Sequence, residues 1–139
     1  MHSSPEIEYR TLDPSMPAEA IVALYCDADW WEKGYTPDFI APMLAGSFAV
    51  IGAFDGDKLI GMGRAIADGA SDAYIQDIVV LSSYRKQGIG GAIVRELIAR
   101  LKAAGIDWIG LVASPGAALF YQSLGFEELK DHTPMRLKA

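Results

Sequence analysis

The sequence predicts an α+β (mixed α/β) fold: a three-layer sandwich in which a central, mixed, twisted sheet of about six or seven strands is flanked by about four helices. Three observations lead to this fold class. Strand-like segments and short helices alternate up to residue 81, a helical period follows, and another strand-like segment comes after it. With 139 residues, 51% of them hydrophobic, one domain over residues 1–139 can bury a core.

The first half is predicted to hold a strand, two short helices and a hairpin. Ile7 and Tyr9 alternate with charged residues, as in a half-buried strand, and helices begin where a capping residue precedes proline. The turn at 55–57 has the Asp-Gly pair typical of hairpins. The predicted elements are a strand near 7–9, a helix after 13–15, a helix from 36–37 to 44, and strands 48–54 and 58–67.

The second half is predicted to contain one parallel crossover. A strongly apolar strand is followed by an amphipathic helix with apolar residues every four positions, which ends near Gly105. A strand after such a helix crossover is expected to be parallel to the strand before it. The predicted elements are strand 74–81, helix 89–104, strand 108–112, a helix from 114–115 to 124, and one or two edge strands within 126–137.

Charge and composition exclude several classes of function. The net charge of −6 makes nucleic acid a poor partner, although residues 81–139 hold 8 basic and 5 acidic side chains. No apolar run reaches the ~18–20 residues of a membrane span, and the start lacks a secretory signal pattern. Because Cys26 is the single cysteine and only two histidines are present, no metal site is expected. We therefore expect a cytoplasmic protein with neither membrane nor nucleic acid as partner.

The clearest chemical signal is a basic, glycine-rich loop between a buried strand and a long helix. Arg85 and Lys86 lie in this loop, and glycines at 88, 90 and 91 open the helix. The first amides of a helix have no intrahelical partner, the helix dipole adds positive charge there, and glycine lets an anion approach the backbone. The segment therefore predicts a phosphate site. Neither the Walker A pattern nor the three-glycine dinucleotide fingerprint is satisfied, since Ile93 stands where the third glycine belongs.

The pattern Arg85-x-x-Gly88-x-Gly90 resembles the pyrophosphate loop, Gln/Arg-x-x-Gly-x-Gly/Ala, of the GNAT-type (acetyl-CoA-dependent) N-acetyltransferase superfamily. Residues 114–126 are similar to a second segment of that family, Asn-x-x-Ala-x-x-Phe-Tyr-x-x-x-Gly-Phe, with Ser114 where Asn is common. The two segments cover roughly residues 74–126. The resemblance implies a GNAT-like sandwich and acetyl-CoA as the donor substrate, with no metal.

The resemblance also implies how acetyl-CoA is held. The strand before the loop is expected to splay from the next parallel strand, and the pantetheine arm to insert between them. Main-chain groups of Ile78, Val79 and Val80 would bond the arm, and the Val80 amide would polarise the thioester carbonyl. The remaining residues expected to bind the donor are Arg85 and Lys86 through their charge, Gln87, Gly88, Ile89, Gly90 and Gly91 through their amides, and Ser114.

Two residues are candidates for proton transfer. An alkylamine with a pKa near 10 must lose a proton before it attacks, and Asp77, on the splayed strand, is the first candidate base, with water as the alternative. Tyr121 is the candidate general acid for the departing thiolate. The competing hypotheses are that Asp77 binds a backbone amide or an arginine, and that Tyr121 packs beside Phe120. Cys26, on the apolar stripe of the first helix, is expected to be a buried structural thiol.

The acceptor is the least defined part of the prediction. Trp30, Trp31 and Tyr35, with acidic neighbours, suit a primary amine of a small molecule such as an arylalkylamine, amino sugar or polyamine. A core-capping role for the tryptophans is the competing hypothesis. An acyl-CoA-binding regulatory module without turnover, and acetylation of a peptide or protein amine, are the alternative functions. The oligomeric state stays open, with a homodimer as one option.

Overall fold

The computed structural model describes residues 6–139, and its sheet confirms the predicted α+β class. The strands are β1 (Ile7–Thr11), β2 (Ala49–Asp55), β3 (Lys58–Ala67), β4 (Asp72–Val80) and β5 (Trp108–Gly110). They follow one another across the sheet in chain order. The pairs β1–β2, β2–β3 and β3–β4 are antiparallel, and β5 is parallel to β4, as the helical crossover predicts.

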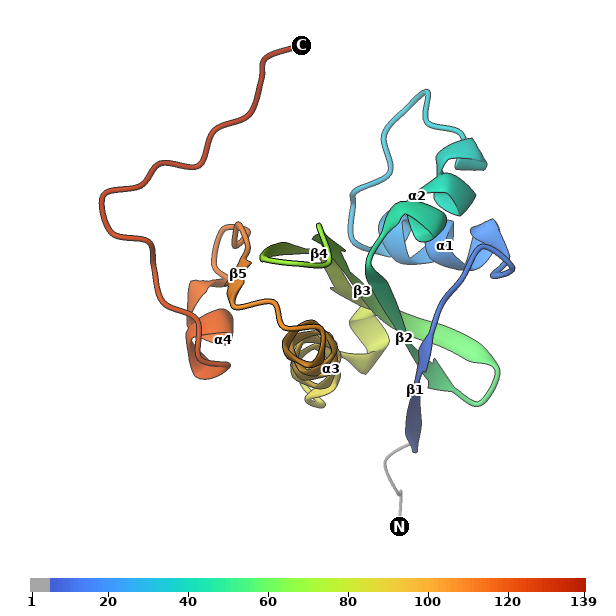
Figure 1. The fold of residues 1–139 in the computed structure, drawn as a ribbon. Helices are drawn as coiled ribbons and strands as arrows, with labels where there is room; N and C mark the ends of the chain where they lie inside the picture. Colours follow the sequence, from blue (N-terminus) through green and yellow to red (C-terminus); the bar gives the residue numbers. More distant parts are fainter. Residues whose placement is uncertain (1–5) are drawn as a thin grey trace.

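Helices cover both faces of the sheet and complete the three layers (Figure 1). They are α1 (Ala18–Asp27), α2 (Ile40–Gly46), α3 (Ile89–Ala103) and α4 (Ala118–Ser123). On one face, α3 buries Ile93 and Leu97 against a core cluster that includes Ile51 and Ile75. On the other face, α1 and α2 bury Ile21, Leu24, Ile40 and Leu44 with Met62. No helix within residues 6–139 is long and apolar enough to cross a membrane.

The strand count and several element boundaries differ from the sequence prediction, most of all after residue 108. Residues 6–139 hold five strands, because no strand forms within 126–137 and every residue from 127 to 139 is exposed. The strand expected over 108–112 ends at Gly110, and the last helix begins at Ala118, after a turn from Ser114 to Ala117. The alternating pattern in the tail forms a strand only if the edge of another strand lies close enough to pair with it. The tertiary structure decides whether such an edge is there.

A β-bulge in β4 shapes the centre of the sheet. Arg64 pairs with Gln76 and Met62 with Val79, so Asp77 and Ile78 together lie opposite the single residue Gly63. Asp77 takes a positive φ of 57°, which is uncommon for a residue other than glycine. A Cβ at Gly63 would overlap the side chain of Ile78 and lie 2.7 Å from Ile93 Cγ2. Glycine at 63 therefore makes the room that the bulge needs.

Candidate active site

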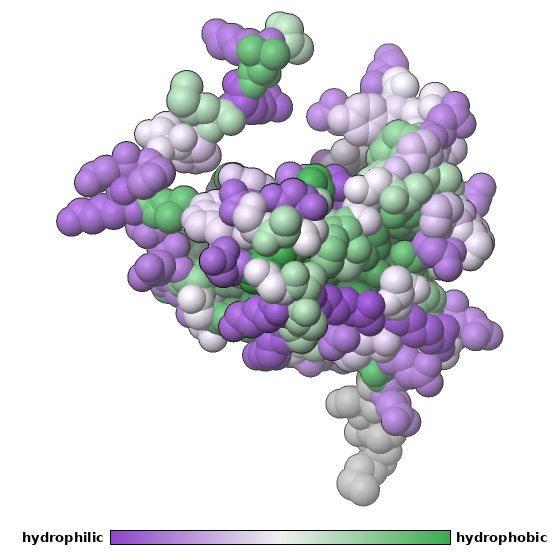
Figure 2. All heavy atoms as spheres, viewed as in Figure 1, coloured by the Kyte–Doolittle hydropathy of each residue, from purple (hydrophilic) through white to green (hydrophobic). Residues whose placement is uncertain are grey.

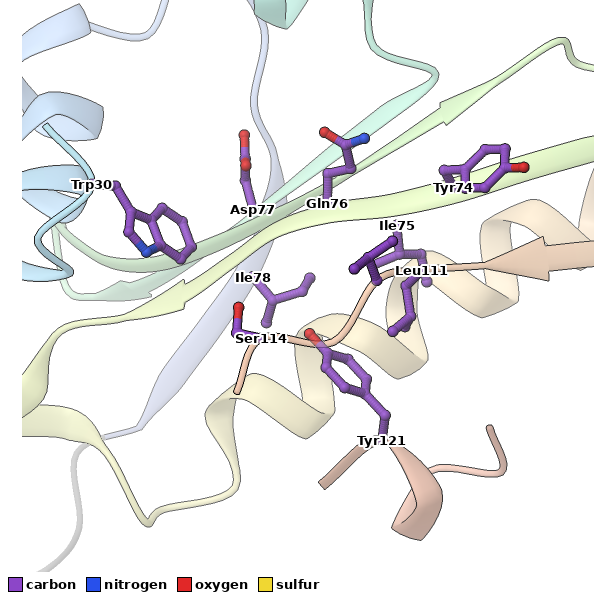
Figure 3. A pocket seen from close by; sticks show the side chains of 10 residues that line it. Trp30, Tyr74, Ile75, Gln76, Asp77, Ile78, Leu111, Ser114 and Tyr121 are labelled. Atoms are coloured by element: carbon purple, nitrogen blue, oxygen red, sulfur yellow. The ribbon is translucent and has the colours of Figure 1, made fainter. Parts of the chain in front are cut away.

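β4 and β5 stay paired over only three positions, from Asp72–Trp108 to Tyr74–Gly110. Beyond them the chains separate, and a cavity of about 250 Å³ lies in the gap (Figure 3). It is lined on one side by residues 74–78 of β4 and on the other by residues that follow β5 and by α4. The separation that the family resemblance implies is thus present, beside Ile78.

Asp77 is held in place by two donors from the neighbouring elements. Arg64 Nε donates to Asp77 Oδ2 at 2.7 Å, and the hydroxyl of Tyr25 donates to the same oxygen at 3.0 Å. Burial, followed by the charge of Asp77, raises the pKa of Tyr25, so this phenol stays a donor. The Arg64 and Asp77 side chains are 16% and 27% exposed, so the ion pair is partly screened by protein. Both hydrogen bonds end on Oδ2, so within residues 6–139 Oδ1 is the carboxylate oxygen left available.

Tyr121 reaches the same cavity from α4. Its side chain points from the helix toward Ser114, whereas the Asp77 side chain points away from it, on the other side of β4 (Figure 3). Edge-on contacts with Phe120 and Phe126, at centroid distances of 4.9 and 5.9 Å, fix the ring. Burial raises the pKa of Tyr121, so its hydroxyl keeps its proton at neutral pH. The structure therefore brings Asp77, Tyr121 and Ser114 to one cavity.

A second pocket, of about 450 Å³, opens on the α1–α2 face of the sheet. Its walls are mostly aromatic and apolar: Tyr25, Trp30, Tyr35, Phe39 and Met43, with Arg64 and Asp77 at its base. Trp30 and Asp77 line both pockets, so the two cavities meet at these residues. Trp31 is not among the lining residues. It stacks on Phe39 with the centroids 5.8 Å apart and packs edge-on to Tyr35, which supports the pocket wall from behind.

The glycine-rich loop has the backbone geometry of an anion site. Gly88, directly before α3, has a φ of 79°, and a Cβ there would meet nothing within 4 Å. Lys86 also has a positive φ, of 64°. No acidic residue lies in the first turn of α3, so the helix itself places no negative charge at its positive dipole end. That the backbone amides of residues 87 to 91 bind acetyl-CoA stays a prediction.

The Arg85 side chain is already engaged by the protein. Its Nε donates to the Val80 carbonyl at 3.1 Å, and Nη2 lies 3.6 Å from Asp27 Oδ2. Asp27 also accepts bonds from the Ser82 hydroxyl and amide, which lower the pKa of its carboxyl. Arg85 and Asp27 therefore tie the loop to β4 and α1. Binding of a phosphate by Arg85 stays a prediction, and it requires the phosphate to compete with Asp27.

Comparison with known proteins identifies the family. The family described as "Acetyltransferase (GNAT) domain" matches residues 46–128, well over half of the chain. The chain belongs to the GNAT acetyltransferase family. Among its relatives, GCN5-related N-acetyltransferase 2, chloroplastic, of Arabidopsis thaliana is 46% identical over 70 residues, covering 50% of this chain and 27% of the relative. The chain thus aligns with only about a quarter of that relative's length.

Solved structures of GNAT proteins share the whole fold. The probable acetyltransferase SA2161 of meticillin-resistant Staphylococcus aureus is 28% identical, with a TM-score of 0.84 over 96% of this chain and 100% of that one. The GNAT family acetyltransferase SP0256 of Streptococcus pneumoniae is 29% identical, with a TM-score of 0.81 over 96% of this chain and 98% of that one. The predicted superfamily is confirmed, and the predicted enzyme class agrees with the names of these relatives.

Two residues of this GNAT site were missed by the sequence analysis. The sequence predicts no role in the site for Tyr25 or Arg64, yet both bind Asp77. Strand alternation places Arg64 on one face of β3, but no sequence signal shows that a bulge turns Asp77 onto that face. Cys26, predicted to be buried, is exposed, because α1 turns Tyr25 and Leu24 toward the core instead. Within residues 6–139 no cluster of three potential metal ligands occurs.

The Arg64–Asp77 pair of this GNAT domain predicts that replacing Arg64 lowers the free energy of unfolding more than replacing Arg100 does. Arg64→Met keeps the side-chain length but leaves the half-buried Asp77 carboxylate without its charged partner. We therefore expect a loss of about 2 kcal/mol in the free energy of unfolding. Arg100→Met is the control, because its ion pair with Glu96 is exposed and contributes about 0.5 kcal/mol or less. Urea denaturation measures both.

The double variant Arg64→Met/Asp77→Asn tests the cause of that loss. It leaves no unpaired charge, so part of the stability lost in Arg64→Met should return. Equal losses in Arg64→Met and Arg100→Met, or no recovery in the double variant, would show that the Arg64 guanidinium contributes by packing alone.

Proposed function

We propose that this GNAT domain transfers the acetyl group of acetyl-CoA to a primary amine of a small molecule, by direct attack within a ternary complex. The observation that carries the proposal is the meeting of two pockets at Asp77 and Trp30. A thioester in the first pocket and an amine in the second would face each other there. Such proximity replaces a bimolecular collision with a reaction inside one complex.

The donor side offers the two features that CoA requires, a slot for a flexible arm and a site for phosphate. Beyond Tyr74, β4 has no strand partner on the β5 side within residues 6–139, so main-chain groups of Ile78, Val79 and Val80 are proposed to bond the pantetheine arm. The amides at the start of α3 are proposed to take the pyrophosphate. Lys86 adds positive charge beside them, and Ser114 lies at the far wall of the slot. Acetyl-CoA would supply the activated acyl group.

This assignment predicts that Gly88 is essential for donor binding. Gly88→Val places a β-branched residue at positive φ, where it distorts the loop and blocks approach to the amides. Acetyl-CoA at a hundred times its Kd stabilises a folded protein by about 2.7 kcal/mol. We expect acetyl-CoA to raise the Tm of wild type correspondingly and to leave the Tm of Gly88→Val unchanged.

Gly56→Val is the matched control for that measurement. Gly56 also has a positive φ, of 60°, and open space around its Cβ, but it lies in the β2–β3 turn. Its Tm should fall through strain while the acetyl-CoA-induced rise persists. An undiminished rise in Gly88→Val would show that the loop makes no contact with the donor.

In the proposed reaction the amine nitrogen bonds to the thioester carbonyl carbon and the carbon–sulfur bond breaks. The proton lost by the amine goes to Asp77 Oδ1 directly or through a water molecule. The departing thiolate takes a proton from the Tyr121 hydroxyl, which burial keeps protonated. The products are an amide and free CoA. Arg64 and Tyr25 hold the carboxylate so that Oδ1 is presented while Oδ2 stays engaged.

The acid role of Tyr121 predicts a loss in rate when only its hydroxyl is removed. Tyr121→Phe keeps the packing with Phe120 and Phe126, so its stability should match wild type. Its kcat should fall by about 10²-fold or more, with KM little changed, because proton donation matters in the transition state. Tyr9→Phe, on β1, is the control. A kcat equal to wild type would make the tyrosine structural.

The walls of the second pocket favour an arylalkylamine as acceptor. Four aromatic side chains line it, and Asp77, the one carboxylate among its described lining residues, is paired with Arg64. A polyamine needs further anionic partners for its additional charges, and Asp27, Asp29 and Glu32 do not line the pocket. A flat apolar body would instead pack on Trp30 and Tyr35.

An assay of CoA thiol release with a panel of amines tests the proposed function. We expect 2-phenylethylamine to be acetylated with a higher kcat/KM than spermidine or glucosamine 6-phosphate. Turnover of only a peptide amine would favour a protein acceptor. Acetyl-CoA binding without thiol release from any amine would favour the non-catalytic module.

A further inference from the structure

The Arg64 guanidinium borders the second pocket with donor groups to spare. A guanidinium carries five N–H groups. Nε donates to Asp77 at 2.7 Å, whereas the other two contacts are long: Nη2 lies 3.3 Å from Gln76 Oε1, and Nη1 lies 3.5 Å from Ser47 Oγ. Three of the five N–H groups are thus engaged, two of them weakly, and two have no acceptor within residues 6–139. Because Arg64 lines the pocket and is partly exposed, a ligand in the pocket can use these donors.

Arg64 and Asp77 form a fixed pair of opposite charges at the base of this pocket. They are joined through Nε and Oδ2, so the Nη1 and Nη2 donors on one side and Asp77 Oδ1 on the other are left for a ligand. Gln76 and Asp77 point to the same side of β4 in Figure 3, and Arg64 bonds both from β3. The complement of such a pair is a ligand with an amine and a carboxylate on the same carbon atom.

The charge balance of the proposed reaction points to the same kind of ligand. Asp77, the one carboxylate among the described lining residues of the second pocket, is the counter-ion of Arg64. When Asp77 takes a proton from the amine, its carboxyl group becomes neutral. With an acceptor that has no carboxylate, the partly buried Arg64 then has no anion beside it, which is costly. A carboxylate on the acceptor would pair with Arg64 throughout this step.

We propose that the acceptor is an aromatic α-amino acid, an inference that rests on the proposed function and narrows it. The amine lies at Asp77 Oδ1, and the carboxylate accepts hydrogen bonds from Nη1 and Nη2 of Arg64. The aromatic ring packs on Trp30 and Tyr35, in a pocket that opens on the α1–α2 face, where Figure 2 shows apolar surface.

The reaction keeps the carboxylate of this acceptor unchanged. The bond from the neutral amine nitrogen to the thioester carbonyl carbon forms, and the carbon–sulfur bond breaks. The nitrogen loses a proton to Asp77, the thiolate gains one from Tyr121, and solvent restores both side chains. The products are the N-acetyl amino acid and free CoA. In this step Arg64 passes from pairing with Asp77 to pairing with the carboxylate of the acceptor.

Three acceptors that share one aromatic ring test the role of the carboxylate. The kcat/KM for thiol release from acetyl-CoA is measured with L-phenylalanine, L-phenylalaninamide and 2-phenylethylamine. We expect L-phenylalanine to have the highest value, by about 10-fold or more, because a carboxylate held by two N–H groups of one arginine forms strong, charge-assisted bonds. The amide controls for amine acidity, since its amine is the more acidic of the two but its carboxyl group carries no charge.

The outcomes of this assay separate the inference from the proposed function. An equal or higher kcat/KM for L-phenylalaninamide or 2-phenylethylamine overturns the inference, while the proposed function stands. No thiol release with any of the three acceptors or with the wider panel of amines overturns the proposed function, and the inference with it.

The variant Arg64→Lys tests whether the guanidinium causes the preference. Lysine keeps a positive charge for Asp77 but has a single donor nitrogen, so it cannot hold two carboxylates through separate nitrogens. The ratio of kcat/KM for L-phenylalanine to that for 2-phenylethylamine should fall by about 10-fold or more. Because the ratio is taken within one preparation, a loss of folded protein cancels out.

Arg10→Lys is the matched control for that variant. Arg10 lies on β1 and pairs with Glu8, where both side chains are exposed and outside both pockets. Its ratio should equal that of wild type. A ratio in Arg64→Lys that also equals the wild-type value overturns the inference.

Discussion

The candidate site depends on one irregularity, the bulge that sets Asp77 and Ile78 together opposite Gly63. In a regular strand, Gln76 and Asp77 would face opposite sides of the sheet. The extra residue turns both toward Arg64, which donates to each of them, while Ile78 covers Gly63 on the α3 side. The bulge thereby joins the aromatic pocket on the α1–α2 face to the gap between β4 and β5.

Charge is divided between the two sides of this site. On the acceptor side, Asp77 is balanced by Arg64, so the pocket presents aromatic surface and a fixed ion pair instead of net negative charge. On the donor side, the start of α3 carries no acidic residue, and Asp27 is occupied by Ser82 and Arg85. In the proposed reaction, a polyanionic donor and an amine acceptor would therefore meet different surroundings, although both would approach the same carboxylate.

The distal wall of the donor slot is the least firmly anchored part of the fold. β5 has three residues and α4 has six, and no residue of α4 is buried. Tyr121 and Ser114 belong to this wall.

Sequence by itself determined the features that rest on local geometry. The glycine loop, the start and length of α3 and the Asp-Gly hairpin follow from neighbours in the chain, and each was found where predicted. The structure places Asp77 and Tyr121 beside one cavity, and their roles as base and acid stay predictions. Only tertiary structure decided the partners of Asp77, because Tyr25 and Arg64 lie 52 and 13 residues away from it in the chain. They reach Asp77 because of a bulge that the hydrophobic pattern of the sequence does not show. The tail is the opposite case. Its alternating pattern favours a strand locally, but a strand needs a neighbouring strand edge to pair its backbone hydrogen-bonding groups. The fold leaves residues 127–139 without such an edge.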